Sequence, residues 1–295
     1  MQIRAAAGTS FLLRRPCQPL EFSMPLLKND RFKFGQNWSS FLSVVNEERM
    51  LQSQQSLCHS LQLANLEGLR LLDVGCGSGL FSLAARRLGA RVHSFDYDSD
   101  SVGCTLRLKE QFYPSDENWT IEQGSALDRR YLTGLGEFDI VYSFGVLHHT
   151  GDLWAALDQV TVPLKPCGKL LVGIYNDQET QSRRWWYLKQ RYNRGSVLTK
   201  RALEGIVWWE GWGQYFLRDL IRLKPFRTWR IWKSYASQRG MSPWHDVVDW
   251  AGGFPFEVAK PEQVFAFYLQ RGFALKGLKT CGGGKGCNEF LFIKG

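Results

Sequence analysis

Hydrophobic and polar positions follow two different periods through the first 180 residues. Short apolar runs, as in buried strands, alternate with segments in which apolar residues recur at spacings of three and four. The expected strands are 71–74, 91–95, 119–122, 138–143 and 169–175, and the expected helices are 36–64, 80–88, 100–112 and 153–160. This alternation predicts a parallel sheet covered by helices on both faces.

The pattern changes near the C-terminus, where a helix over 261–270 is followed by strands over 273–279 and 289–293. Gly282, Gly283 and Gly284 lie between these strands and adopt positive φ without strain, which predicts an antiparallel hairpin. We therefore expect an α/β fold, with a doubly wound, Rossmann-like sheet of seven mostly parallel strands, ending in an antiparallel C-terminal hairpin.

A helical insertion is expected after the fifth strand, where the alternation stops for about seventy residues. Residues 178–250 hold nine of the 12 tryptophans, and residues 178–240 hold 14 Lys or Arg against 4 Asp or Glu. The net charge of the chain is +9, so the basicity belongs to this segment. A solvated helical face explains this excess of basic residues as well as an anion-binding patch does. Three functions stay open: a lid over a substrate, a platform for a homodimer, or peripheral contact with an anionic surface.

The start of the chain and the bulk composition add two expectations. Arg4, Arg14 and Arg15 precede the first acid, Glu21, but a flexible extension or a true start at Met24 is favoured over an organelle transit peptide. The chain lacks a run of about 18 uncharged apolar residues, and its seven cysteines lack paired spacing. These features predict a soluble, cytoplasmic protein with reduced thiols.

A glycine-rich turn follows the first expected strand, with the sequence Gly75-Cys76-Gly77-Ser78-Gly79. Backbone without side chains lets a ligand lie against it. A dinucleotide-binding turn would place glycine where Leu80 stands, which disfavours a pyrophosphate ligand. Asp96 ends the second strand, where a carboxylate can accept hydrogen bonds from the two hydroxyls of a ribose. Its alternative role, capping the next helix, suits Asp98 or Asp100 better.

Five motifs in this order resemble the class I S-adenosylmethionine-dependent methyltransferases: 73–79, Asp96, 124–128, 138–149 and 164–168. Ser125 stands where many relatives carry Asp, and Cys167 replaces a glycine of the last motif. The resemblance implies S-adenosyl-L-methionine as cofactor. The cofactor-binding residues it implies are Asp73, Gly75, Cys76, Gly77, Gly79, Asp96, Tyr97, Ser125, Ala126, Phe144 and His149.

The chain resembles one branch more closely, the ubiquinone-biosynthesis-like or small-molecule methylases, through residues 31–38, 244–250 and 281–289. That resemblance implies methyl transfer to a small-molecule or carrier-linked acceptor, such as a quinol or a glycan. The alternative is an RNA or protein methyltransferase that binds its substrate with the basic insertion. Nucleic acid is disfavoured as a partner because 143–146 lack the Asn/Asp-Pro-Pro-Tyr/Phe tetrapeptide of many amine methylases.

The expected organisation has four parts. Residues 1–30 form the N-terminal extension, 31–177 the S-adenosylmethionine-binding core, 178–250 the basic insertion, and 251–295 the helix and hairpin that complete the sheet.

Histidines are the candidate catalytic bases, because methylation of a hydroxyl requires proton removal and imidazole titrates near neutrality. His149 follows the fourth strand near the expected methyl position, with a role in shaping the pocket as its alternative. His148 is expected to point into the following helix. His245 is the second candidate catalytic residue.

The expected acceptor-binding residues lie at the end of the fifth strand, Tyr175 and Asn176, and within the insertion, Trp244, His245 and Asp249. One histidine with the nearby carboxylates does not amount to a metal-ligand set, so no metal is expected. Cys281 and Cys287 are interpreted as packed thiols.

Overall fold

The computed structural model describes residues 31–32, 34–35, 45–224, 226–239 and 243–295. The predicted N-terminal extension and the first part of the predicted helix over 36–64 lie outside the described residues. The side chains of residues 236–239 and of His245 also lie outside the description.

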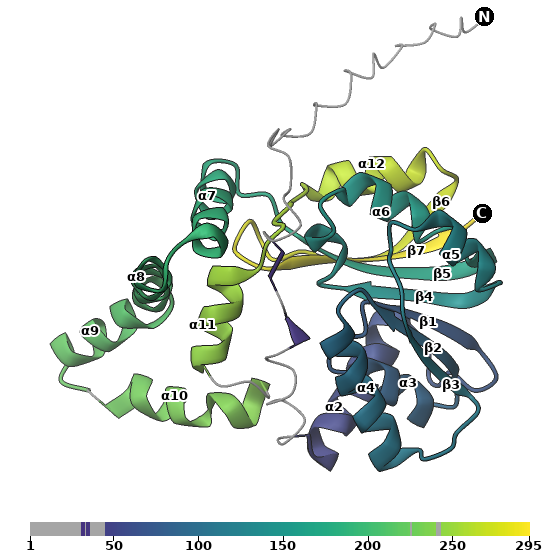
Figure 1. Cartoon of the computed structure of the whole chain (residues 1–295), viewed down its shortest axis with the longest axis horizontal. Helices are drawn as coiled ribbons and strands as arrows, with labels where there is room; N and C mark the ends of the chain where they lie inside the picture. The colour runs from purple at the N-terminus through teal and green to yellow at the C-terminus, as the bar shows by residue number, and fades with distance from the viewer. Residues whose placement is uncertain (1–30, 33, 36–44, 225, 240–242) are drawn as a thin grey trace, which may run out of the picture.

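Seven strands form one twisted sheet (Figure 1). They are β1 (Arg70–Val74), β2 (Arg91–Asp96), β3 (Trp119–Gln123), β4 (Phe138–Phe144), β5 (Leu164–Tyr175), β6 (Phe273–Lys279) and β7 (Cys287–Lys294). Their order is β3-β2-β1-β4-β5-β7-β6, with β1 to β5 parallel and β7 antiparallel to both of its neighbours. The predicted fold class and terminal hairpin are confirmed. The strand order reverses between β1 and β4, and open α/β sheets bind ligands at such a reversal.

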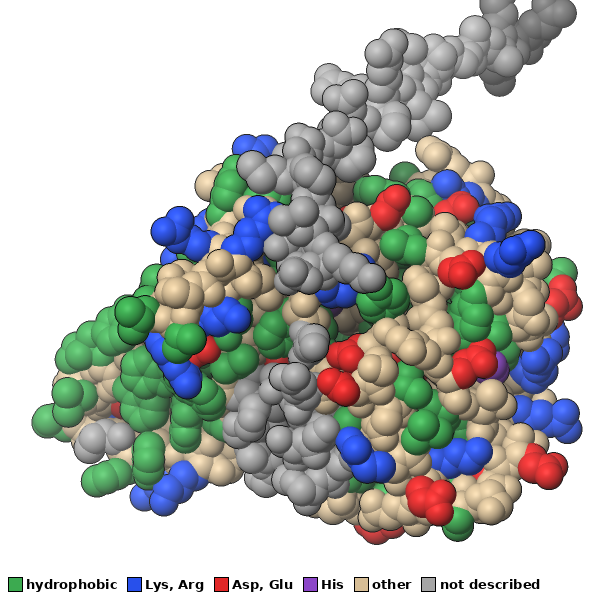
Figure 2. Space-filling model, in the orientation of Figure 1, with side chains coloured by type: hydrophobic (Ala, Val, Ile, Leu, Met, Phe, Trp, Pro, Cys, Tyr) green, Lys and Arg blue, Asp and Glu red, His purple; other side chains and the backbone are tan. Residues whose placement is uncertain are grey.

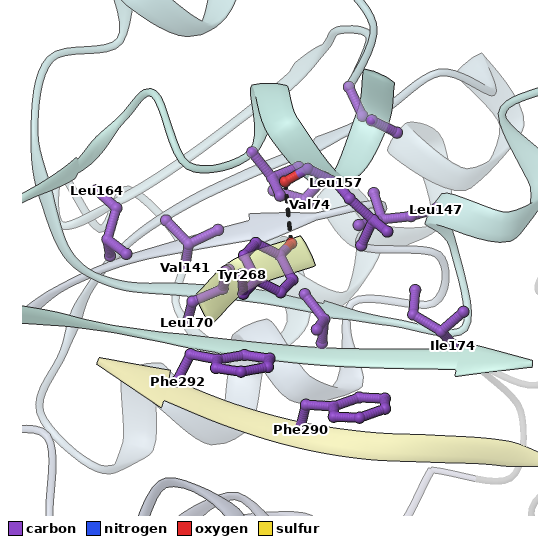
Figure 3. Close-up of a cluster of buried hydrophobic side chains, with 14 of the residues drawn as sticks. Val74, Val141, Leu147, Leu157, Leu164, Leu170, Ile174, Tyr268, Phe290 and Phe292 are labelled. Carbon is purple, nitrogen blue, oxygen red and sulfur yellow. Dashed lines mark hydrogen bonds between the residues drawn. The ribbon is translucent and has the colours of Figure 1, made fainter. Parts of the chain in front are cut away.

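Helices cover both faces of the sheet. One face packs against α2 (Glu47–Leu61), α3 (Leu80–Arg87) and α4 (Ser99–Phe112), and the other against α5 (Arg129–Gly134), α6 (Leu153–Gln159) and α12 (Pro261–Leu269). Figure 3 shows the core between the sheet and α5, α6 and α12. Tyr268 packs there beside Phe292, and the Tyr268 hydroxyl donates to the Leu157 carbonyl at 2.9 Å. This bond satisfies the one polar atom that the ring brings into the core.

Two element boundaries differ from the sequence prediction, and one helix was not predicted. Within the helix predicted over 36–64, α2 begins at Glu47, where the Asn46 side chain accepts from the Arg49 N–H and caps it, and ends at Leu61 instead of 64. Residues 36–44 lie outside the described residues. Strand β5 begins at Leu164, earlier than predicted, because Leu164 pairs with Phe138 before a register shift. The short α5 was missed, although Asp128 caps it by accepting from the Tyr131 N–H.

Between β5 and α12 the chain forms a helical lobe at the side of the sheet (Figure 1). It consists of α7 (Thr180–Arg194), α8 (Val197–Trp208), the π-helix η3 (Trp209–Gly213), α9 (Gln214–Ile221), α10 (Phe226–Arg239) and α11 (Pro243–Gly252). The lobe has its own core, in which Trp185, Trp186 and Phe254 are buried. No helix in the described ranges combines the length and the apolar character needed to cross a membrane.

The outer surface of this lobe is apolar and basic (Figure 2). Its exposed apolar side chains include Val197, Leu198, Leu217, Leu220, Ile221, Leu223, Phe226, Trp229 and Ile231. Two of its acids, Glu204 and Asp219, are buried instead, and Asp219 accepts hydrogen bonds from Thr228. The lobe therefore places apolar groups and cations on its outside.

Candidate active site

The glycine-rich turn between β1 and α3 is strained for any other residue. Gly75, Gly77 and Gly79 have φ of 80°, 55° and 79°, in the left-handed region that glycine favours. A side chain at Gly75 would overlap Val146, and a Cβ at Gly79 would lie 2.8 Å from Thr105 Cγ2. The turn therefore presents bare backbone at the strand reversal.

Asp96 lies against this turn. Its Oδ2 accepts from the Gly77 N–H at 3.0 Å and its Oδ1 from the Asp98 N–H at 2.9 Å. Burial raises the pKa of the carboxyl, an effect that these two hydrogen bonds oppose. The structure thus brings the predicted acid and the predicted turn together, with both carboxylate oxygens acting as hydrogen-bond acceptors.

Asp73 lies below the turn and is buried in a polar network. Ser82 donates to its Oδ2, Ser82 Oγ and Ser94 Oγ lie 2.7 Å apart, and Trp119 Nε1 donates to Ser94 Oγ at 2.9 Å. Burial raises the pKa of Asp73 to about 7, against the lowering effect of Ser82. These bonds join α3 to β1, β2 and β3. Asp73 therefore has a structural role that does not depend on ligand binding.

The remaining predicted cofactor residues line the same end of the sheet. Tyr97 follows β2 and is exposed, with the Arg31 guanidinium 4.5 Å above its ring. Ser125 Oγ follows β3 and accepts from the Leu127 N–H at 3.2 Å, beside the buried Ala126. Cys76 is also buried, and its Sγ accepts from Thr105 Oγ1 at 3.3 Å.

Phe144 is the last residue of β4, and His149 follows the strand. The exposed Phe144 ring lies against Gly173 of β5, where a side chain would overlap it. His149 lies on the short 3-10 helix η2 (Leu147–His149), and its Nδ1 donates to the Pro255 carbonyl at 2.6 Å. Burial lowers the pKa of His149 to about 3, so the ring is neutral at pH 7 and a weak base. These features favour a positioning role over the predicted proton removal.

His148 and Tyr175 begin an aromatic cluster at the end of β5. The two rings stack with centroids 3.8 Å apart, and His148 Nδ1 accepts from the Tyr175 N–H at 3.3 Å. Tyr175 also lies 5.7 Å from the Trp250 centroid and 5.6 Å from that of Phe256. Tyr175 therefore connects the sheet to the lobe.

Asn176 is turned toward the β6–β7 hairpin. Its Nδ2 donates to the Gly284 carbonyl at 3.3 Å, and its Oδ1 accepts from Asn288 Nδ2 at 3.0 Å. Asn288 Oδ1 in turn accepts from the Cys281 N–H at 3.1 Å. The polar groups of Asn176 thus hold the glycine-rich hairpin turn.

Helix α11 carries the remaining predicted acceptor residues. Trp244 is exposed near its start, Tyr235 donates to Asp246, and the Asp249 carbonyl accepts from the Gly253 N–H at 2.8 Å. His245 lies on the same helix, with its side chain outside the described residues. Within the described ranges, no three His, Cys, Asp or Glu side chains are arranged to hold a metal ion.

Lys189 is a buried cation that the sequence reasoning missed. It lies on α7, is 1% exposed, and donates from Nζ to the Trp250 carbonyl. Its Nζ also lies 4.3 Å from the Trp250 centroid and 4.9 Å from that of Phe256. Burial lowers the pKa of Lys189 to about 7, against the raising effect of Asp249. Its spacing from Trp185 and Tyr192 places it on the apolar face of the helix, and that signal could have identified it.

The chain matches a family model described as "Methyltransferase domain" over residues 21–212. The ubiquinone biosynthesis O-methyltransferase of Bradyrhizobium sp. (strain ORS 278) is 30% identical over 142 residues, which cover 46% of this chain and 53% of the relative. The protein of the same name from Rhodopseudomonas palustris (strain TIE-1) is 33% identical over 139 residues, covering 45% and 52%. The chain thus spans about half the length of the curated relatives it matches.

Among solved structures, a SAM-dependent methyltransferase from Anabaena variabilis ATCC 29413 superposes with a TM-score of 0.52 at 11% identity. The match covers 92% of this chain and 96% of that one. At this identity the similarity concerns the fold.

Proposed function

This chain belongs to the methyltransferase domain family, and from that premise we propose that it transfers the methyl group of S-adenosylmethionine to an oxygen of a small-molecule or carrier-linked acceptor. The family match and the fold confirm the predicted class, a class I S-adenosylmethionine-dependent methyltransferase. The choice of oxygen follows the name of the curated relatives, which are O-methyltransferases. The acceptor itself belongs to the proposal.

One observation carries the proposal: Asp96 lies against a turn that only glycine can form. The turn fits the methyl donor, because a ligand can lie against backbone that carries no side chains, and a Cβ at Gly75 or Gly79 would push against Val146 or Thr105 and distort the turn. Asp96 fits the ribose, because a carboxylate has about four acceptor positions and the adjoining backbone N–H groups use only part of them. The two hydroxyl groups of a ribose can donate to the positions that remain.

When bound, S-adenosylmethionine supplies an activated methyl group on a positively charged sulfur. The protein then contributes binding and alignment, since positioning alone can lower a barrier by about 7–11 kcal/mol in favourable cases. In our proposal, Asp96 orients the nucleoside, Ser125 and Ala126 contact the base, and Phe144 and His149 shape the pocket beside β4. Tyr175 faces the acceptor from the end of β5.

Replacing Asp96 with Ala tests this assignment through donor binding. We expect the affinity for S-adenosylhomocysteine to fall by about 1.5–3 kcal/mol, as for lost hydrogen bonds to a charged group. Isothermal calorimetry measures the change. Asp100→Ala is the matched control, because Asp100 is exposed on the adjoining helix and should leave the affinity unchanged. Equal affinity of the Asp96→Ala variant and the parent chain would remove Asp96 from the binding site.

A further inference from the structure

Three buried N–H donors near Lys189 have no hydrogen-bond acceptor among the described residues. They are His148 Nε2, Trp185 Nε1 and Trp250 Nε1, which come from η2, α7 and α11. His148 is 0% exposed and Trp185 is 1% exposed. Because His148 Nδ1 accepts from the Tyr175 N–H, its Nε2 carries the proton. Buried donors in folded proteins are almost always paired, so three unpaired ones at one place require an explanation.

The donors belong to one continuous set of rings. His148 stacks on Tyr175 at 3.8 Å, Tyr175 contacts Trp250 at 5.7 Å, and Trp250 contacts Trp185 at 5.3 Å. Phe256 closes the set beside Tyr175 and Trp250. We call these five rings and Lys189 the aromatic enclosure.

Charged side chains of both signs lie at the enclosure, and Lys189 is the buried one. Lys189 lies within it, and Lys285 of the hairpin turn places its Nζ 4.4 Å from the Trp185 centroid. The charge of Asp249 on α11 raises the pKa of Lys189, against the lowering effect of burial. Glu210 is already engaged by Arg184 and lies 3.6 Å from Lys285. Asp246 also lies close enough to act on Tyr175. The enclosure thus joins one buried cation, Lys189, to three N–H donors that lack an acceptor among the described residues.

We propose that the aromatic enclosure binds a carboxylate of the methyl acceptor, with Lys189 as its cation and the indole N–H groups of Trp185 and Trp250 as hydrogen-bond donors. This inference rests on the proposed function, because it concerns the acceptor of the same site. A carboxylate has two oxygens with about four acceptor positions, enough for the unpaired donors.

The enclosure suits a singly charged group better than a phosphate. A buried charge must be matched by an opposite one, and only one lysine, Lys189, is fully buried here. Phosphate sites in proteins usually present arginine forks or several backbone N–H groups. The walls of this enclosure are aromatic side chains instead.

Nuclear magnetic resonance of the full chain labelled with 15N-tryptophan tests the proposal. Benzoate is titrated as the probe, with benzamide as its neutral counterpart of nearly the same shape. We expect the indole resonances of Trp185 and Trp250, assigned with Trp185→Phe and Trp250→Phe, to move with benzoate. Benzamide should bind about tenfold more weakly or worse, because it lacks the charge that Lys189 pairs with.

Two variants distinguish a carboxylate site from a structural lysine. Lys189→Met keeps the length of the side chain and should weaken benzoate binding about tenfold or more, whereas Lys224→Met, at an exposed lysine of the same lobe, should not. Trp185→Phe keeps an aromatic ring, removes one donor, and should also weaken benzoate binding. Trp209→Phe, at an exposed tryptophan, is its control. This second pair decides the question if Lys189→Met does not fold.

Three results would overturn the proposal. They are equal binding of benzoate and benzamide, stationary indole resonances of Trp185 and Trp250, and a larger response to inorganic phosphate than to benzoate. Stationary resonances would mean that benzoate does not bind at these donors, as expected if an ordered water satisfies them. Calorimetry with S-adenosylhomocysteine on the same sample separates the two levels: donor binding without benzoate binding rejects only the carboxylate site. Absence of donor binding rejects the methyltransferase assignment.

Discussion

Asp73 in the sheet and Lys189 in the helical lobe are both buried and ionisable, and their hydrogen-bond surroundings differ. Asp73 in the sheet and Lys189 at the base of the lobe have their pKa values moved by burial, from opposite directions, to about 7. Asp73 is bonded to Ser82, which continues to Ser94 and Trp119. Lys189 has one acceptor, the Trp250 carbonyl, and unpaired N–H donors around it.

This difference separates a structural polar group from a binding one. A buried network with every member paired makes the packing of its elements specific. A cluster with spare donors costs stability until an acceptor arrives, which is the usual state of a site without its ligand. The paired network therefore makes the sheet rigid, whereas the junction with the lobe contains N–H donors without acceptors.

The largest expected effect tests the rigidity of the sheet. Phe290 is buried in β7 and stacks on Phe292 at 5.9 Å. Replacing Phe290 with Ala should lower the free energy of unfolding by about 3–5 kcal/mol, because it leaves a cavity that the strands cannot close. Urea denaturation measures this. Phe265→Ala on α12, at a ring on the surface, is the control and should cost far less. Similar losses for both variants would contradict a tightly packed sheet.

The second prediction concerns the pH dependence that Asp73 confers. Its pKa is about 7 in the folded chain against 3.8 for an ordinary Asp, so the folded state holds a proton that the unfolded state has released. Stability therefore falls as the pH rises from about 4 to about 7, by up to about 1.4 kcal/mol per pH unit. Asp73→Asn removes this contribution and should gain stability relative to the parent across that window.

Comparing the two chains at each pH isolates Asp73 from other groups. Glu257, whose pKa burial raises to about 7, acts in the same direction, and His149, lowered to about 3, acts in the opposite one. Both are present in parent and variant, so their effects cancel in the difference. A difference in unfolding free energy that stays constant between pH 4 and 7 would show that Asp73 is ionised throughout.

The sequence predicted the parts of the molecule that local patterns encode. The Gly75–Gly79 turn could be identified because positive φ at three positions requires glycine. Asp96 could be identified because it stands at the end of an expected strand. The strands were found from their apolar runs. Helix α5 was missed because six residues are too few for a helical period to emerge, and only its cap at Asp128 marks it.

Features that depend on distant residues could not be predicted in this way. Lys189 is buried because Trp250, 61 positions later, folds over it. The weak basicity of His149 likewise follows from its burial and its bond to Pro255. Asn176 was expected to face the acceptor, but its amide is occupied by a hairpin more than a hundred positions away. In each case the residue contacts groups that are far away in the sequence, so the local sequence pattern does not predict those contacts.

The smallest expected effect tests the outer surface of the lobe, which completes the contrast with the sheet. Leu223 is 88% exposed at the turn after α9, where the chain takes a positive φ of 53°. Leu223→Ser should change the free energy of unfolding by no more than about 0.5 kcal/mol, because the side chain is in water in both states. Urea denaturation at several protein concentrations measures this. A loss above 1 kcal/mol that grows with protein concentration would mean that copies of the chain cover this face, because only an associated state links stability to concentration. A urea midpoint that does not change would instead mean that the apolar side chains on the lobe are exposed to water. In the sheet, by contrast, such side chains are buried.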